Sequence, residues 1–119
     1  MHSYEIKRWR LKNDSIARAV KILEELLVGL DVAYWEASSI DRKDFFYDLI
    51  CAIHSELSEI GKLSVQDHDL VYEPITAEFR AARTKLSKLR KMLDEFLLRS
   101  GTAARLETLI NEAVSLPAR

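Results

Sequence analysis

The sequence predicts an all-α fold, an up-down-up bundle of three long antiparallel helices with a short C-terminal fourth helix. Apolar residues recur at alternating steps of three and four along most of the chain, which is the period of an α-helix. The alternation typical of β-strands is absent from the sequence. Short connections between long helices make consecutive helices antiparallel neighbours. The chain has 119 residues, which is the size of one domain, so we expect residues 1–119 to form a single helical-bundle domain.

Composition excludes several classes of protein. Apolar residues make up 48% and charged residues 31%, as in ordinary globular domains, and the net charge of −1 gives no global attraction to nucleic acid or membranes. The apolar run Ile22–Tyr34 is interrupted by Glu24, Glu25 and Asp31, so no membrane-spanning segment is predicted. Met1–Lys12 lacks the cleavage site of a signal peptide. We therefore expect a cytoplasmic protein.

The first helix is expected to run from about Tyr4 to Trp35. Asn13 is the polar member of its stripe and fits a polar seam position inside one continuous helix. Alternatively, Asn13 or Asp14 caps a fresh helix and Met1–Lys12 forms a separate arm. We favour the continuous helix because the spacing passes through Asn13 without a slip. The apolar positions of the stripe are Ile6, Trp9, Ile16, Val20, Leu23, Leu27 and Leu30.

Two features lie toward the end of this first helix. Gly29 costs about 1 kcal/mol relative to Ala in a helix interior, which is either tolerated or indicates close approach by a neighbouring helix or aromatic ring. The corner Ala33–Ile40 follows, and its Tyr34 and Trp35 are expected to close the top of the core.

The second helix is expected over Asp41–Lys62. Ser38 and Asp41 resemble a capping box at its start. Gly61 is placed to end it as a left-handed residue. The apolar stripe of this helix comprises Phe46, Ile50, Ile53, Leu57 and Ile60, and Phe45 and Leu49 widen it.

The third helix follows the connection Leu63–Glu73, in which Ser64 can cap a short turn. Pro74 either occupies the first position of the helix or kinks a longer one, and the restriction it places on Glu73 favours the fresh start. The stripe of the third helix comprises Ile75, Phe79, Ala82, Leu86, Leu89, Leu93 and Phe96.

The short fourth helix is expected from Thr102, as its cap, to about Ser115. Gly101 indicates the end of the preceding helix. The apolar edge of the fourth helix is formed by Leu106, Ile110 and Ala113.

Charged residues fall into blocks that match the predicted topology. Folding up-down-up brings the basic start of the first helix toward four acidic residues, and the basic end of the third helix toward the acidic first corner. Opposite charges would then meet at both ends and help select this topology over others. The four acidic residues at the first of these ends are Glu56, Glu59, Glu73 and Glu78.

Two side chains that could carry chemistry lie on the second helix. Cys51 is the only cysteine, which excludes an internal disulfide, and its apolar surroundings predict a buried thiol. Cys51 and His54 have metal-ligand spacing, but a closed zinc site needs four ligands, and His68 with its acidic neighbours lies a dozen residues on. We therefore expect no metal site.

A helical bundle that carries a histidine on one helix resembles the histidine-phosphotransfer domains, which are also helical and near this length. His54 is followed by Ser55, Glu56, Leu57 and Ser58, whereas that family has a lysine and a glycine in a His-x-x-Lys-Gly pattern. A structural or surface role for His54 is therefore favoured, and phosphotransfer through His54 remains the lesser alternative.

A basic segment lies near the N-terminus. We expect it to pair with the acidic residues at the same end of the bundle, which is a purely structural role. The alternative is a nucleic-acid-binding bundle that uses this basic patch. The patch comprises Lys7, Arg8, Trp9, Arg10 and Lys12.

The sequence favours a small, non-catalytic protein-interaction module, either an adaptor or a regulator of another macromolecule, with no cofactor. Its candidate interaction face is a second apolar strip on the first helix, next to the main stripe: Ala19, Ile22, Leu26 and Ala33. We expect this face to bind a protein partner or a second copy of the chain in a homodimer, unless the fourth helix covers it.

Overall fold

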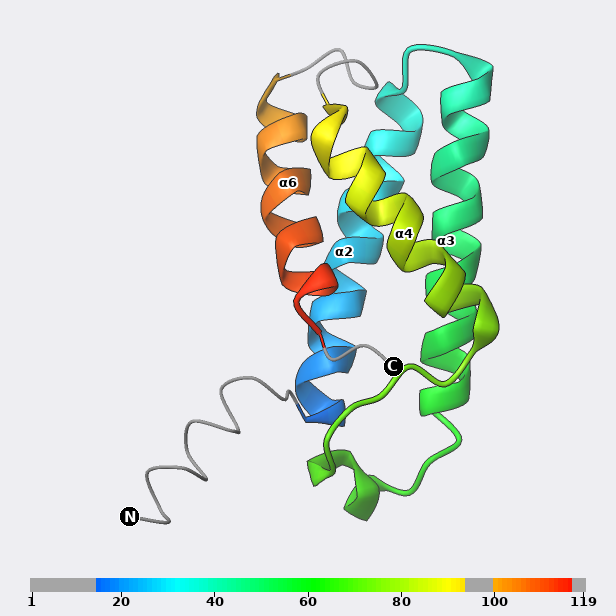
Figure 1. Ribbon diagram of the computed structural model, residues 1–119, viewed down its shortest axis with the longest axis vertical. Coiled ribbons are helices and arrows are strands. Elements are labelled where there is room, and N and C mark those ends of the chain that lie inside the picture. The colour runs from blue at the N-terminus through cyan, green and yellow to red at the C-terminus, as the bar shows by residue number, and fades with distance from the viewer. Residues whose placement is uncertain (1–14, 94–99, 117–119) are drawn as a thin grey trace.

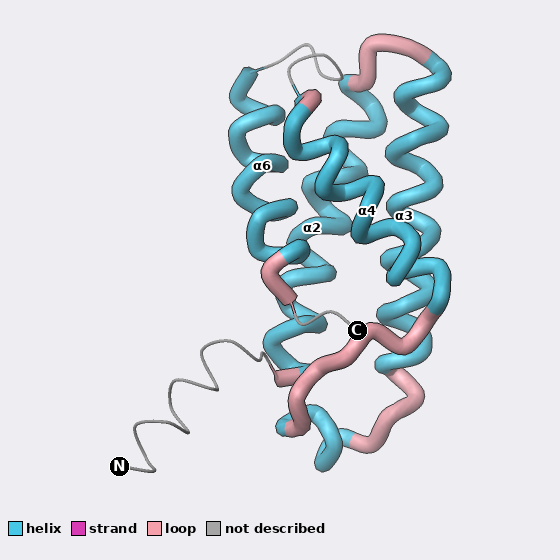
Figure 2. The backbone as a smooth tube through the Cα atoms, in the orientation of Figure 1, coloured by secondary structure: helices cyan, strands magenta, loops and turns pink. Residues whose placement is uncertain are grey.

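The protein is described by a computed structural model that covers residues 15–93 and 100–116 (Figure 1). The all-α expectation is confirmed, since the described chain consists of helices joined by loops (Figure 2). The elements are α2 (Ile16–Glu36), α3 (Ile40–Ile60), the 3₁₀-helix η1 (Val65–Asp69), α4 (Ala77–Lys91) and α6 (Ser100–Val114).

The four α-helices of the described residues form a ring in which each helix is antiparallel to the next of the four (Figure 1). α2 packs against α3 and α6, and α4 also packs against α3 and α6. The predicted up-down-up start and C-terminal fourth helix are confirmed. At 15 residues each, α4 and α6 have the same length, whereas α2 and α3 have 21 residues each.

The start of α2 corrects the prediction of one helix from Tyr4 to Trp35. Ser15 has an extended backbone, with ψ of 161°, and its hydroxyl accepts a hydrogen bond from the Arg18 amide at 3.2 Å as an N-cap. Ser15 also pairs with Val71, and the Ile16 amide donates to the Leu70 carbonyl at 2.8 Å. The connection after α3 therefore returns to fix where α2 begins. Asn13 lies outside the described residues.

The ends of α3 also differ from expectation. Ser39, not Ser38, is the N-cap and accepts from the Arg42 amide, while Ser38 accepts from the Arg42 guanidinium at 2.9 Å. Gly61 has right-handed helical angles, φ −62° and ψ −17°, so the expected left-handed ending is wrong. The Gly61 amide donates to the Leu57 carbonyl at 2.9 Å, and ordinary turns then carry the chain away.

The later helices start elsewhere than predicted. α4 is a fresh helix, as favoured, but its N-cap is Thr76, whose hydroxyl accepts from the Phe79 amide; Pro74 precedes the helix. Gly101 lies in the first turn of α6 and does not end a helix, and Thr102 is inside α6, so the predicted stop and cap are both wrong. The turn after α3 is confirmed as η1, although Ser64 makes no side-chain capping bond.

The core runs through the centre of the ring, and on α3 it includes Phe46, Ile53 and Ile60 of the predicted stripe. Leu49 and Glu56 are buried, whereas Ile50 and Leu57 are half-buried at its edge. On α6 the predicted apolar edge is confirmed. The largest fully buried side chains are Tyr72, Phe46, Phe79, Leu23, Leu26, Leu30, Leu49, Ile53, Ile60, Leu86, Leu89 and Leu106.

Within residues 15–93 and 100–116, no helix combines the length and the apolar character that crossing a membrane requires.

Candidate functional site

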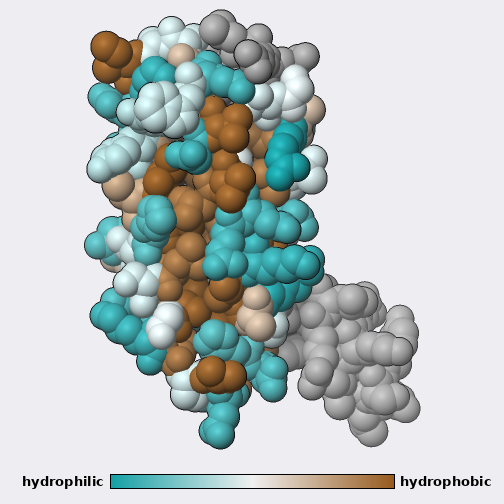
Figure 3. Space-filling model, turned by 180° about the vertical axis from the view of Figure 1, so that it is seen from behind, coloured by the Kyte–Doolittle hydropathy of each residue, from teal (hydrophilic) through white to brown (hydrophobic). Residues whose placement is uncertain are grey.

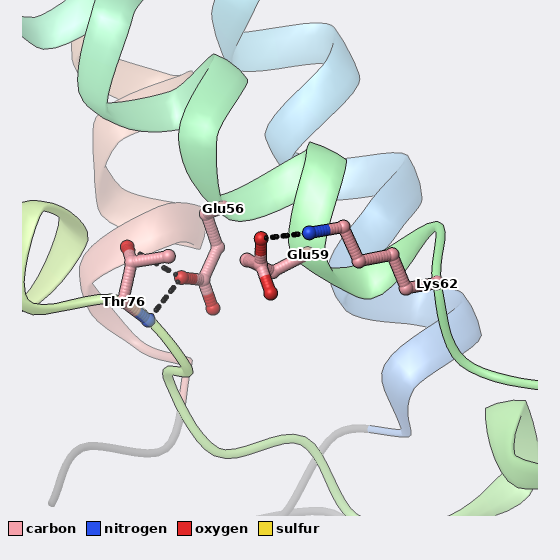
Figure 4. A network of polar contacts seen from close by, with 4 residues as sticks. All are labelled: Glu56, Glu59, Lys62 and Thr76. Atoms are coloured by element: carbon pink, nitrogen blue, oxygen red, sulfur yellow. Dashed lines mark hydrogen bonds and ion pairs between the residues drawn. The ribbon is translucent and has the colours of Figure 1, made fainter.

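A buried carboxylate organises the lower end of the bundle (Figure 4). Glu56 is fully buried and accepts from the Tyr72 hydroxyl, from the amides of Ile75 and Thr76 at 2.8 and 2.9 Å, and from the Thr76 hydroxyl at 2.9 Å. Both carboxylate oxygens are therefore partnered, and the charge lies near the positive end of the α4 dipole.

This cluster is a structural joint, because its contacts tie α3 to the linker before α4. Burial, reinforced by the hydrogen bond to Glu56, raises the pKa of the Tyr72 hydroxyl, which stays protonated and donates. The proposed pairing of Glu56 with the basic N-terminal segment is wrong, because its oxygens are occupied inside the chain. Glu56 follows Ile53 by three residues and precedes Ile60 by four, and this helical spacing could have predicted that its side chain points into the core.

The predicted interaction face on α2 is buried inside the chain. Ala19, Ile22, Leu26 and Ala33 are each at most 4% exposed, so the prediction that this strip is open to a partner is wrong. The physical reason is α6: a Cβ added at Gly29, on the same side of α2, would lie 2.6 Å from Leu109 Cδ1. The close approach suggested by Gly29 is thus made by α6, and this strip is core.

The side chains considered for chemistry do not gather into one site. Cys51 is exposed, so the predicted buried thiol is wrong: its position faces outward at the groove between α3 and α4. His54 is also exposed, on α3, and His68 is half-buried in η1. In the described parts of the chain, no three His, Cys, Asp or Glu side chains come together in a way that could hold a metal ion.

The charge-block prediction can be followed only in part. Lys85 of α4 lies 4.0 Å from Asp48 of α3, a pair of the expected kind between the two helices, and both side chains are half exposed. The alternative basic patch, Lys7, Arg8, Trp9, Arg10 and Lys12, lies outside the described residues.

The most distinctive surface is an apolar ridge on α2. Val28, Val32 and Trp35 are spaced by four and three residues, so they share the face of α2 opposite the core, and they are 58%, 44% and 72% exposed. We call these three residues the outer face of α2. Figure 3, the view from behind that of Figure 1, shows that apolar surface is exposed lengthwise on this side of the molecule, and the residues of the outer face are those with the exposed fractions given above. Such contiguous exposed apolar surface marks interaction sites.

The exposed Trp35 indole is held in place by its neighbours. Its ring makes an edge-to-face contact with Tyr34, with centroids 5.2 Å apart and an interplanar angle of 90°. Lys43 Nζ donates to the carbonyls of Tyr34 and Trp35 at 2.7 and 3.2 Å, and lies 5.1 and 5.8 Å from their ring centroids. This lysine therefore satisfies carbonyls in the last turn of α2 while it positions both rings.

A small cavity of about 150 Å³ lies beside Val32, where α2 meets the start of α6. It offers room for part of one inserted side chain next to the ridge. It is lined by Gly29, Val32, Gly101, Thr102, Arg105 and Leu106.

Acidic side chains flank the outer face. Glu24, Glu25 and Asp31 are all exposed, and each lies three, four or seven residues from at least one of Val28 and Val32. Between Glu24 and Glu36, α2 carries no basic residue. Lys21 is exposed three and four residues before Glu24 and Glu25, and Arg105 of α6 lines the cavity beside Val32. The ridge is thus apolar, with charges of both signs beside it.

The expectation that Trp35 closes the core is wrong, and sequence reasoning missed the outer face. Positions 28, 32 and 35 carry helical spacing of their own, on the side opposite the main stripe, and that was the available signal. Comparison of the chain with protein-family models, with curated proteins and with solved structures found no match in any of the three.

Proposed function

We propose that the protein is a small, non-catalytic interaction module that binds another protein through the outer face of α2, and that it acts in the cytoplasm. The exposed Trp35, continuous with Val28 and Val32, carries this proposal. Tryptophan is the residue type most often found at the energetic centre of protein interfaces, and burying it removes a large apolar area from water.

The surroundings of Trp35 support a role for this side chain in binding a partner. The Trp35 ring makes an edge-to-face contact with Tyr34 and lies 5.8 Å from Lys43 Nζ, and both contacts reduce the conformational freedom that the side chain would lose on binding. Three apolar side chains exposed on one helix face do not stabilise the fold, because their area stays in water. Burying them against a partner would stabilise a complex.

Photo-crosslinking in the native host tests this proposal. The photoreactive amino acid p-benzoylphenylalanine would replace Val32, and in a control it would replace Val65 on η1, which is also a valine and is more exposed. We expect a discrete crosslinked protein from position 32, absent from position 65, and lost when Trp35→Ala is added.

Mass spectrometry would then identify the captured chain and the crosslinked peptide, and the purified pair should form a complex in solution. Equal labelling from positions 32 and 65, or a product that persists in the Trp35→Ala variant, would contradict the proposal.

A further inference from the structure

We infer that residues 70–76, the linker before α4, form a latch that Glu56 holds closed and that couples the start of α2 to the start of α4. The linker crosses the lower end of the bundle from the first turn of α2 to the first turn of α4 (Figure 1). In its closed state it fixes both helix starts, and its release frees them together. This conformational device does not depend on the outer face of α2.

The first part of the linker holds the start of α2. The Leu70 carbonyl accepts from the Ile16 amide at 2.8 Å, and Val71 pairs with Ser15 in an antiparallel bridge. Ile16 is the first residue of α2, so its amide is one of the donors that have no acceptor within the helix itself. The linker supplies that acceptor and thereby fixes this end of α2.

The second part of the linker is held by a single side chain of α3 (Figure 4). Glu56 accepts from the amides of Ile75 and Thr76 and from the hydroxyls of Tyr72 and Thr76. Thr76 is also the N-cap of α4. Hydrogen bonds to a carboxylate are stronger than those between neutral groups, and all four of these depend on one carboxylate. A change at Glu56 therefore weakens every one of them at once.

Tyr72 connects the two attachments. It follows Val71 directly in the chain, its side chain is fully buried, and its hydroxyl donates to Glu56. A buried side chain restricts the backbone that carries it, and one peptide bond separates this residue from the pairing with Ser15. Release of the Tyr72 hydroxyl would therefore loosen the linker as far as the first turn of α2.

The linker is the direct connection between these two helix starts. In the ring, α2 and α4 lie diagonally, and each packs against α3 and α6. The Arg80 guanidinium of α4 donates to the Pro74 carbonyl at 2.7 Å, so the linker is also attached to α4 itself. Segments held by a few hydrogen bonds at one end of a domain open as cooperative units without global unfolding. We expect the linker and the two helix starts to form such a unit.

Native-state hydrogen exchange of the full 119-residue chain, followed by NMR, tests the inference. The reporters are the amides of Ile16, Ile75 and Thr76. Glu56→Gln should lower the protection of all three by a common factor of at least about 10-fold, although Glu56 makes no hydrogen bond to Ile16 among the described residues. Tyr72→Phe, which removes only the hydroxyl, should lower the same three by a smaller common factor.

Two controls separate opening of the latch from global unfolding. The Lys43 amide donates to the Ser39 carbonyl at 2.9 Å in the first turn of α3, at the other end of the bundle, and Glu56→Gln should change its protection by less than about 2-fold. The control variant Gly29→Leu disturbs the contact between α2 and α6 away from the linker. It should lower global stability and leave the protection of the three reporters within about 2-fold.

The other outcomes overturn the inference. If Ile75 and Thr76 lose protection in Glu56→Gln while Ile16 keeps it, the two helix starts are not coupled. If none of the three changes, Glu56 does not hold the linker. An equal loss at Lys43, or an equal loss at Ile16 in the control variant, would show that this end opens only when the whole domain unfolds.

Discussion

Glu56 and Trp35 both lie where their residue types are uncommon, one a fully buried carboxylate and the other a tryptophan that is 72% exposed. They lie toward opposite ends of the bundle, and they differ in what surrounds them. Every oxygen of Glu56 is partnered within the chain, whereas Trp35 is contacted at its edge by Tyr34 and approached by Lys43, and most of its surface faces water.

This difference in surroundings gives the two residues different roles, Glu56 in the stability of the fold and Trp35 in binding a partner. A buried charge is tolerated only when hydrogen bonds compensate for its lost hydration, so the Glu56 cluster must be complete for the fold to hold. An exposed tryptophan contributes little to folding, because its area remains in water. Changes at Glu56 should therefore act on stability, and changes at Trp35 on binding.

The largest effect is expected from Glu56→Leu. This change leaves the Tyr72 hydroxyl and the amides of Ile75 and Thr76 without their acceptor, and at about 1–3 kcal/mol for each unsatisfied donor the free energy of unfolding should fall by roughly 3–5 kcal/mol. Glu56→Gln keeps an acceptor oxygen and should cost roughly 1–3 kcal/mol. Urea denaturation followed by circular dichroism would measure both. A loss below about 1 kcal/mol in the Leu variant would show that the cluster is dispensable.

Overpacking between α2 and α6 should come next. Gly29→Leu places a side chain where even a Cβ would lie 2.6 Å from Leu109 Cδ1, and we expect a loss of roughly 2–3 kcal/mol. Gly101→Ala is the matched control, because a Cβ there has no other atom within 4 Å, and it should stabilise by up to about 1 kcal/mol. If both variants unfold at the same urea concentration, α6 does not pack on Gly29 as described.

Tyr72 should make stability depend on alkaline pH. Its pKa is raised in the folded protein by burial and by Glu56, so its contribution is fully present below the ordinary tyrosine pKa of about 10. Above that pH the unfolded chain releases the proton that the folded chain keeps, and stability falls by up to about 1.4 kcal/mol per pH unit. The stability difference between the wild type and Tyr72→Phe should stay constant below about pH 9 and shrink steadily as the pH rises above about 10. A difference that stays constant over the whole range would contradict the assignment.

Trp35→Ala should have the smallest effect on folding, less than about 1 kcal/mol, because the side chain is mostly exposed. Its effect on binding should be complete, as set out for the crosslinking experiment. Thermal unfolding would check the first part. A loss above about 2 kcal/mol would make Trp35 a structural residue and remove the contrast with Glu56.

The interaction face shows why sequence spacing alone misplaced the surface. Ile22 and Leu26 recur at helical spacing beside the main stripe, and the pattern left open whether a partner or the fourth helix covers them. Both strips are apolar, and a helix with a wide apolar arc packs against two neighbours at once. The small Gly29 marks where α6 comes closest, but a glycine does not indicate which neighbour approaches.

By itself, the sequence determined the helical class, the order of the helices and most of the core, because helical periodicity is written into local spacing. It also located the fresh start before α4, since proline restricts the residue before it. These features depend on residues close together in the chain.

The tertiary structure decided which face of each helix is covered and where α2 begins. Ser15 starts α2 because the distant Leu70 and Val71 pair with the chain there, and Glu56 is buried because the linker before α4 supplies its donors. Trp35 stays outside because α6 takes the opposite side of α2, next to Gly29. Each of these outcomes depends on contacts between residues far apart in sequence, which local spacing does not encode.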